Sequence, residues 1–259
     1  MASVISFVQQ KGGTGKTTST LNVAGHLARR GRKTLVVDLD PQASATTGSG
    51  VSSDSVEENM YDVLIDRLDI RKIIVETGGD YHLAPAGLDL VGADAMLHRT
   101  PGRTFFALSE ALAPVRNFYD FILVDVPPGS GVLAFNAVEA LDLLLVPFDP
   151  GIFALESFQS LEILLQDFGK LLKRKIRISG AVLTRWKRVS TQWEPGETLN
   201  ELSGQLTERF GRLFTIPFTN KIYEAQLAGL PISHFSPSSR ASLAYEEIAK
   251  YIEEKVNEG

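Results

Sequence analysis

Short runs of apolar and β-branched residues alternate along the chain with longer segments in which apolar positions recur at helical spacing. The short runs predict strands at residues 4–8, 34–37, 81–83, 121–124, 143–146, 176–183 and 213–216. The longer segments predict helices at residues 17–30, 57–67, 88–97, 104–116, 155–172, 198–210 and 241–256. Because this alternation is typical of βαβ units, we expect an α/β fold with a doubly wound, mostly parallel sheet and helices on both faces.

No boundary in the sequence divides the chain into domains. The Ser- and Gly-rich stretch 44–55 lies between runs that one sheet needs, so it indicates a loop rather than a linker. A chain of 259 residues with 44% hydrophobic content can bury a substantial core, and α/β domains of this length are commonly undivided. We therefore expect a single domain over residues 1–259.

The composition of the chain excludes several classes of protein. A net charge of −5 argues against a protein that coats nucleic acid through its overall charge, so any such contact must be local. The absence of cysteine excludes disulfides, thiolate-held zinc and Cys-ligated iron–sulfur clusters. The start of the chain lacks signal-peptide features, and the apolar runs are far shorter than the roughly 20 residues that span a bilayer. These features favour a cytoplasmic protein without a membrane span.

A glycine-rich loop follows the first predicted strand and leads into the first predicted helix. Glycines let backbone N–H groups converge on phosphate, and the helix N-terminus adds the positive end of its dipole. In this context Lys16 is expected at the β- and γ-phosphates, the Thr17 hydroxyl on Mg²⁺, and Thr18 near the α-phosphate. The sequence therefore predicts a P-loop that binds MgATP through Lys11, Gly12, Gly13, Thr14, Gly15, Lys16, Thr17 and Thr18.

The loop departs from the common P-loop pattern at two positions. Gln10 stands where a first glycine is expected, and Lys11 adds a second lysine. The segment Lys11 to Thr18 resembles the loop of the ParA/MinD family of deviant-Walker ATPases. The resemblance covers nearly the whole chain and is closest to the ParA branch, through Val37-Asp-Leu-Asp-Pro-Gln42, Tyr119-Asp-Phe-Ile-Leu-Val-Asp125-Val-Pro-Pro128, Phe153-Ala-Leu-Glu156, and Ile216-Pro217 followed by Glu224-Ala225.

This resemblance implies a P-loop NTPase fold and a role for Lys11 across a two-fold interface. In such a homodimer Lys11 reaches the phosphates of the ATP bound to the other subunit. A cation delivered by the partner would neutralise charge as an arginine finger does, which couples dimerisation to the triphosphate. A solvated loop lysine is the plainer alternative for Lys11.

Three aspartates follow predicted strands, at the edge where open α/β sheets bind ligands. Pro41 biases Asp40 towards an extended backbone, and the resemblance implies that Asp40 positions or activates the attacking water. Asp38 is expected to support the magnesium shell and Lys16, although a turn-forming role is the alternative for both residues. Asp125 ends an apolar run and fits a Walker-B carboxylate. The expected catalytic residues are Lys11, Lys16 and Asp40, and the expected metal-site residues are Thr17, Asp38 and Asp125.

The base contacts are implied by the resemblance alone. It points to the loop after Ile216, with Pro217, Thr219 and Asn220 as the candidate residues. The family commonly has Pro-Arg-Asn where this chain has Pro217-Phe218-Thr219, so the side chain that contacts adenine stays open.

Eight Lys and Arg residues and no Asp or Glu lie between residues 168 and 193. The predicted strand 176–183 would separate the two ends of this run by roughly 26 Å. Only the second group lies at the edge that carries the nucleotide, so the candidate DNA contacts are Arg185, Lys187, Arg188 and Lys221. A solvated charged face is the alternative. The resemblance implies that the ATP dimer binds DNA without sequence preference and that a ParB-like, cargo-bound protein stimulates hydrolysis, giving a nucleoid-associated ATP-bound state.

Two other functions compete with this hypothesis. A MinD-like membrane-cycling ATPase would need a C-terminal amphipathic helix rich in Lys and Arg, whereas the last predicted helix carries Glu246, Glu247, Glu253 and Glu254 among its apolar residues. We therefore expect that helix to pack in the core, with no stable membrane association. An ATP-dependent metabolic enzyme would need a substrate site, but the sequence shows no His, Asp or Glu constellation beyond the phosphate-binding carboxylates.

Overall fold

A computed structural model describes residues 1–99, 104–149, 154–186, 204, 207–208 and 210–258. Its centre is an eight-stranded sheet in the order β3-β4-β2-β5-β1-β6-β7-β8. All neighbouring strands are parallel except β3 and β4. The strands are β1 (Ser3–Phe7), β2 (Thr34–Asp38), β3 (Val75–Glu76), β4 (His82–Ala84), β5 (Phe121–Asp125), β6 (Leu143–Phe148), β7 (Gly180–Trp186) and β8 (Leu213–Pro217). This confirms the expected doubly wound α/β fold.

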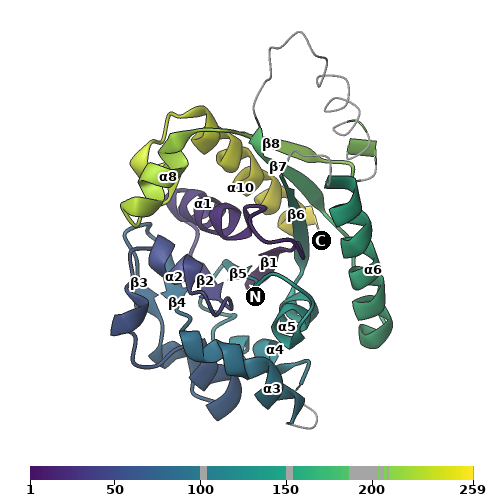
Figure 1. The fold of residues 1–259 in the computed structure, drawn as a ribbon. Coiled ribbons are helices and arrows are strands. Elements are labelled where there is room, and N and C mark those ends of the chain that lie inside the picture. The colour runs from purple at the N-terminus through teal and green to yellow at the C-terminus, as the bar shows by residue number, and fades with distance from the viewer. Residues whose placement is uncertain (100–103, 150–153, 187–203, 205–206, 209, 259) are drawn as a thin grey trace.

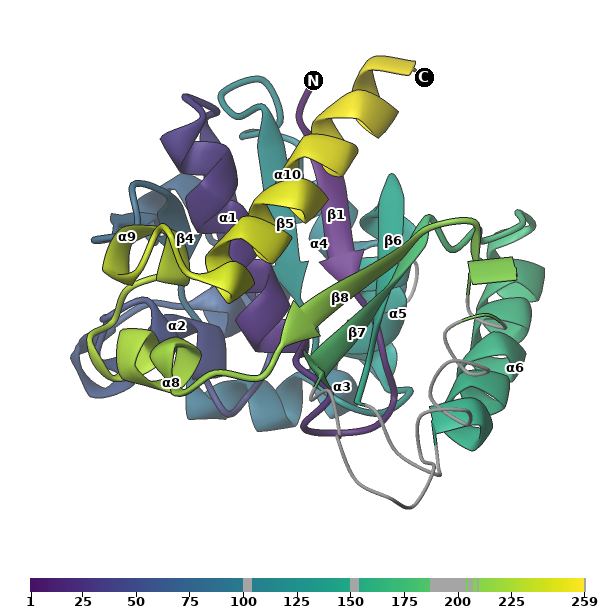
Figure 2. The same ribbon diagram turned by 90° about the horizontal axis from the view of Figure 1, so that it is seen from above.

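Helices cover both faces of the sheet (Figures 1 and 2). One face carries α1 (Lys16–Arg29), α8 (Asn220–Leu227), α9 (Ile232–Phe235) and α10 (Arg240–Glu258). The other face carries α3 (Ala93–His98), α4 (Ala107–Leu112), α5 (Val132–Ala140) and α6 (Ala154–Leu172), and the short α2 (Ser44–Gly48) follows β2. Shorter helical turns are η1 (Ser53–Ser55), η2 (Asp62–Asp66), η3 (Ile70–Lys72) and η4 (Leu88–Gly92).

The central strands are buried on both sides, which explains their continuous apolar runs. In β1, Ile5 and Phe7 belong to the core beneath α1 and α10, whereas Val4 belongs to the core on the opposite face. Alternating residues of one strand thus serve two cores, as expected for a parallel sheet between helical layers. No helix in the described part of the chain is both long and apolar enough to cross a membrane.

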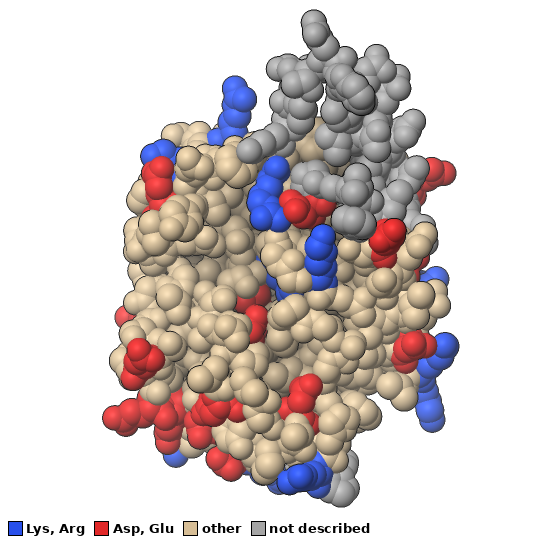
Figure 3. Space-filling model, in the orientation of Figure 1, with Lys and Arg blue, Asp and Glu red and all other residues tan. Residues whose placement is uncertain are grey.

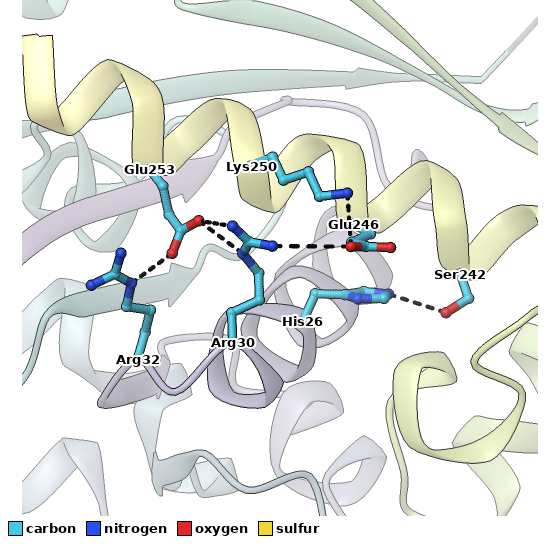
Figure 4. Close-up of polar contacts among 7 residues, drawn as sticks. All are labelled: His26, Arg30, Arg32, Ser242, Glu246, Lys250 and Glu253. Carbon is cyan, nitrogen blue, oxygen red and sulfur yellow. Dashed lines mark hydrogen bonds and ion pairs between the residues drawn. The ribbon is translucent and has the colours of Figure 1, made fainter.

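Helix α10 packs along α1 through apolar and charged contacts (Figure 4). Ile248 and Ile252 are buried, and the largely buried Glu253 carboxylate accepts hydrogen bonds from Arg30 Nε at 2.8 Å and Arg32 Nε at 2.6 Å. Glu253, one of the four glutamates noted in the sequence of this helix, therefore pairs with arginines within the fold. The predicted core packing of the last helix is confirmed.

The strand predictions are close to the observed bounds with one exception. The strand predicted at 176–183 lies at 180–186, because its pairing with β6 begins only at Gly180. Ile176 and Ile178 precede that register and pack, partly buried, against the core instead. Their apolar side chains therefore led to a strand prediction that was wrong at these positions.

The helix predictions were less accurate. The predicted helices 57–67 and 104–116 are reduced to the short elements η2 and α4, whereas the predicted helix 88–97 is helical throughout, as the 3₁₀ turn η4 followed by α3. Arg67, in a left-handed conformation with φ 60°, ends the first of them. Strand β3 and helices α5, α8 and α9 were not predicted, and the stretch 44–55, expected to be a loop, contains α2 and η1. Most of the helix expected at 198–210 lies outside the described residues.

Candidate nucleotide site

The strand register places the predicted phosphate and metal residues together. Asp38 ends β2 and Asp125 ends β5, and these two residues are direct partners in the parallel register. The loop between β1 and α1 lies at the same carboxyl edge, so Thr17 reaches across and donates a hydrogen bond from Oγ1 to Asp125 Oδ2 at 2.7 Å. Strand order therefore brings together groups that are 108 residues apart.

The loop itself requires glycine at two positions. Gly13 and Gly15 have φ values of 73° and 93°, a left-handed region that residues with a Cβ rarely adopt. Gly15 also lies against β7, where an added Cβ would be 3.0 Å from Thr184 Cγ2. Lys16 begins α1 and is only 6% exposed.

The ammonium group of Lys16 is affected in opposite directions by its burial and by nearby carboxylates. Burial lowers the pKa of its ammonium group, whereas the nearby carboxylates of Asp125 and Asp40 raise it. Its Nζ donates to the Lys11 carbonyl oxygen at 3.4 Å. Phosphate oxygens in the adjoining cavity would supply the counter-charge that this buried cation needs.

The fully buried Asp125 fits a magnesium site. Burial and the charge of Asp38 raise the Asp125 pKa, while the hydrogen bond from Thr17 lowers it. Asp125 Oδ1 has no hydrogen-bond partner among the described residues. A carboxylate oxygen left unpaired beside a threonine hydroxyl is a suitable ligand for a hard cation such as Mg²⁺.

Asp38 has a different position from the one expected of a simple metal ligand. Its Oδ1 accepts from Asp40 N at 3.0 Å, and its Oδ2 accepts from both the backbone N and the Oγ1 of Thr46 at 2.8 Å. Burial raises its pKa to about 6. Asp38 therefore holds the loop that carries Asp40. In the described residues, no group of three or more His, Cys, Asp or Glu side chains is arranged to bind a metal, so magnesium would depend on phosphate oxygens as well.

Asp40 combines the two roles considered from the sequence. Its Oδ1 accepts from Gln42 N at 2.9 Å, which forms the turn expected of an aspartate before proline. The side chain is nevertheless a wall of the cavity beside Lys16, and Asp40 is 9% exposed. Asp40 therefore forms a turn and also lines the cavity.

A cavity of about 910 Å³ opens at this edge, on the face that is hollowed near its centre in Figure 3. Pro217, Thr219 and Asn220 line it, as predicted, opposite the P-loop. Thr219 caps α8 by accepting from Lys221 N at 3.2 Å. The sequence prediction missed other lining residues because it missed α8, although Thr219 followed by apolar positions at helical spacing was a usable signal. These residues are Ile222, Tyr223, Gln226 and Leu227.

Helix α8 is linked to the phosphate side of the site. Gln226 Nε2 donates to Thr18 Oγ1 at 3.1 Å. Thr18 is the residue expected near the α-phosphate, so the helix beside the expected base pocket contacts the P-loop helix directly. The P-loop and α8 therefore line the same cavity and are joined by a hydrogen bond.

The predicted DNA contacts have acidic partners where they are described. Arg185 lies within β7 rather than beyond it, and it pairs with Asp149, with Nη2 to Oδ2 at 2.7 Å. Lys221 pairs with Glu224 at 2.7 Å. Lys187 and Arg188 lie outside the described residues. In Figure 3, both basic and acidic side chains border the hollow, and further Asp and Glu side chains gather on the lower part of the same face.

Comparison with known proteins extends over nearly the whole chain. A family model described as an AAA domain matches residues 2–178. The chromosome-partitioning ATPase Soj of Thermus thermophilus is 34% identical over 259 residues, covering 98% of this chain and 96% of that protein. The structure of the septum site-determining protein MinD of Pyrococcus horikoshii, complexed with Mg-ADP, has a TM-score of 0.77 and 27% identity, covering 97% of this chain and 96% of that one.

A metabolic enzyme shares the same fold. Cobyrinic acid a,c-diamide synthase of Mycobacterium smegmatis, with bound ATP analogue and magnesium, has a TM-score of 0.80 and 27% identity, covering 96% of this chain and 93% of that one. Both solved structures contain a nucleotide and magnesium, in agreement with the P-loop, Thr17 and Asp125 found here. The chain therefore belongs to the ParA/MinD family of P-loop ATPases, which use ATP and Mg²⁺.

Proposed function

We propose that this protein is a ParA-type positioning ATPase. It dimerises on binding MgATP, binds DNA without sequence preference and leaves DNA after hydrolysis stimulated by a cargo-bound, ParB-like protein. The observation that carries this proposal is the exposed Lys11 on a P-loop whose buried cationic position is already filled by Lys16. A second lysine at the exposed end of the loop can serve a partner subunit's phosphates. The likeness to a chromosome-partitioning ATPase supports the same proposal.

The residues of the site divide the hydrolysis chemistry between them. Bound Mg²⁺ would neutralise charge on the phosphates, and Thr17 and Asp125 would hold it. Lys16 binds the phosphates from the base of the cavity, and Asp40 orients water at its wall. Asp38 fixes the Asp40 loop through its hydrogen bonds to Asp40 and Thr46. The reaction is phosphoryl transfer from ATP to water, and it is slow until the partner protein acts.

DNA binding requires a cationic surface at the edge where the dimer forms. Lys221 and the pair Lys187 and Arg188 remain the candidate contacts, while Arg185 is engaged elsewhere. Phosphate contacts by these residues would make DNA affinity fall with rising salt. The protein would then be cytoplasmic and associated with the nucleoid when ATP is bound.

Similarity to MinD supports a membrane-cycling function as the second candidate. The position of α10 weighs against it, because the apolar residues Tyr245, Ile248 and Ile252 are buried against α1 and the sheet. A membrane-binding helix would have to expose such a face to lipid. Vesicle binding is therefore included as an outcome of the test below.

The test compares Asp40→Ala, Lys16→Ala and Lys11→Ala by light scattering after size exclusion and by DNA binding across a salt series with MgATP. Asp40→Ala is expected to remain a DNA-binding dimer, because ATP binds but is not hydrolysed. Lys16→Ala should be a monomer that does not bind nucleotide, and Lys11→Ala should bind ATP as a monomer. An Asp40→Ala dimer that binds anionic vesicles and ignores DNA would establish the MinD-like function. A Lys11→Ala dimer would overturn the proposed role of Lys11.

A further inference from the structure

The end of β7 holds two carbonyl groups of the P-loop. Arg185 Nη2 donates to the Gly13 carbonyl oxygen at 2.8 Å. The buried Thr184 hydroxyl, which has one proton to donate, lies 3.0 Å from the Thr14 carbonyl oxygen and 2.8 Å from the Phe148 carbonyl oxygen. The Arg185 guanidinium is itself fixed by Asp149, which follows β6, with Nε to Oδ1 at 3.0 Å and Nη2 to Oδ2 at 2.7 Å. Side chains at the end of β7 therefore contact the Gly13 and Thr14 carbonyl groups, and a residue that follows β6 orients one of these side chains.

Fold stability does not explain the Arg185–Asp149 pair. The side chains are 53% and 37% exposed, and ion pairs at such positions contribute little to stability. Arg185 also has φ 54°, a left-handed conformation that is unfavourable for a residue with a Cβ. It lies in a bulge between the register pairs Leu183↔Thr215 and Trp186↔Pro217. Bulges re-aim side chains, and strained backbone of this kind is concentrated at functional sites.

The geometry of the peptide bond gives these contacts a consequence for phosphate binding. In a trans peptide the C=O and the following N–H point in opposite directions. Fixing the Gly13 carbonyl on Arg185 therefore directs the Thr14 N–H away from Arg185. Backbone N–H groups of this loop are the donors that hold nucleotide phosphates. Arg185 and Thr184 both line the cavity in question.

We propose that Arg185, oriented by Asp149, is a positioning residue that holds the Gly13–Thr14 peptide of the P-loop in its phosphate-binding orientation. Its role is then in ATP binding and not in contact with DNA. The inference rests on the ATP site of the family and does not depend on the proposed DNA function, because every measurement below is made without DNA.

The first test replaces Asp149 and relies on the sign of the effect. Removing an acidic charge beside the phosphate site would, by electrostatics alone, tighten ATP binding. Loss of positioning predicts the reverse, so Asp149→Ala should weaken MgATP binding about 3- to 10-fold, the effect of one lost hydrogen bond. Isothermal titration calorimetry with MgATP measures this. Tighter or unchanged binding would overturn the proposal.

A double-mutant cycle tests whether Asp149 acts on ATP binding through Arg185 or independently of it. Arg185→Ala is expected to weaken MgATP binding to a similar extent, and Asp149→Ala should add no further loss in that background. Additive losses would show that Asp149 does not act through Arg185. Arg71→Ala is the matched control, since it removes an exposed arginine that also pairs with an aspartate, Asp69, but does not line the cavity. Its ATP affinity should equal that of the wild type.

Arg185→Gly distinguishes positioning from a structural role. Glycine accepts the left-handed conformation, so the melting temperature of the nucleotide-free protein should stay constant or rise by about 2 °C. MgATP affinity should nevertheless fall as it does in Arg185→Ala. A fall in melting temperature together with affinity would indicate that Arg185 serves the fold, and the proposal would fail.

Discussion

Single residues at this site carry charges that the fold alone would not favour. Asp125 and Asp38 are both fully buried and adjacent in register, and burial raises the pKa of each. Lys16 lies beside them, with its own pKa lowered by burial. A phosphate would pair with the buried Lys16 cation and a metal ion with the unpartnered Asp125 oxygen, whereas Asp38 is held by hydrogen bonds from Asp40 and Thr46. Burial of these charges therefore lowers the stability of the nucleotide-free protein, and we expect ligand binding to offset this loss.

Asp125→Asn should separate stability from function. The change removes one of the buried like charges while retaining an oxygen that can accept from Thr17. The nucleotide-free protein should gain about 1 kcal/mol, or about 2–4 °C in melting temperature. Mg²⁺-dependent hydrolysis should fall at least about 100-fold, because a metal ligand is lost. Calorimetry and a phosphate-release assay measure the two effects. Normal hydrolysis would show that Asp125 does not hold the metal.

At the scale of elements, α1 connects the nucleotide loop to the C-terminal part of the fold. Its first residue, Lys16, belongs to the P-loop, and its other end contacts α10 through Arg30 (Figure 4). Between them lies the buried His26, whose Nε2 is 3.1 Å from Ser242 Oγ on α10. Burial lowers the His26 pKa to about 4, so the imidazole is neutral in the folded protein at neutral pH.

The α1–α10 interface should therefore weaken in acid. The unfolded chain protonates His26 below its ordinary pKa of 6.5, whereas the folded protein resists protonation until about pH 4. This contribution to stability is present above pH 6.5 and is lost as the pH falls towards 4. From pH 7 to pH 5, wild type should lose about 1–2 kcal/mol more than His26→Gln, as measured by urea unfolding. The raised pKa of Asp38 has the opposite effect, since it makes the folded state more stable as the pH falls. Because both proteins contain Asp38, this effect cancels in the comparison. Equal pH profiles would contradict this assignment.

At the scale of the whole molecule, the strand order decides which loops meet. The carboxyl ends of β2, β5, β1, β6 and β7 lie side by side, and each delivers one part of the site. These parts are Asp38 with Asp40, Asp125, the P-loop, Asp149, and Thr184 with Arg185. Ligand binding at this edge therefore links elements from both halves of the sheet. Nucleotide should stabilise the entire fold rather than one loop.

Nucleotide-dependent stability provides a measurement of this linkage. With MgATP at about 100 times its Kd, the folded state gains about 2.7 kcal/mol, which corresponds to a rise of roughly 5–10 °C in melting temperature. Lys16→Ala should lose this rise, and Asp40→Ala should retain it because its defect is in hydrolysis. Scanning fluorimetry with and without MgATP measures both. A full rise in Lys16→Ala would contradict the assignment of Lys16 to the phosphates.

The sequence by itself determined the parts of the site that depend on local chemistry. Glycines with a following lysine and threonine predict phosphate binding, and Asp38, Asp40 and Asp125 follow apolar runs that predict strands ending at one edge. The strand predictions succeeded because a parallel sheet buried on both faces demands continuous apolar strands. The helices of the surface were predicted less well because short elements such as η2 and α4 leave weak periodic patterns.

Only the tertiary structure decided which distant residues meet. The contact of Arg185 with Gly13 joins positions 172 residues apart, and that of Gln226 with Thr18 joins positions 208 apart. Neither side chain has a local pattern that reveals its partner, and the sequence predicts Arg185 as a DNA contact from its charge and its place at the nucleotide edge. The order of β1, β6 and β7 places its guanidinium on the P-loop instead. Charge can be read from sequence, but the group that neutralises it depends on which strands are neighbours.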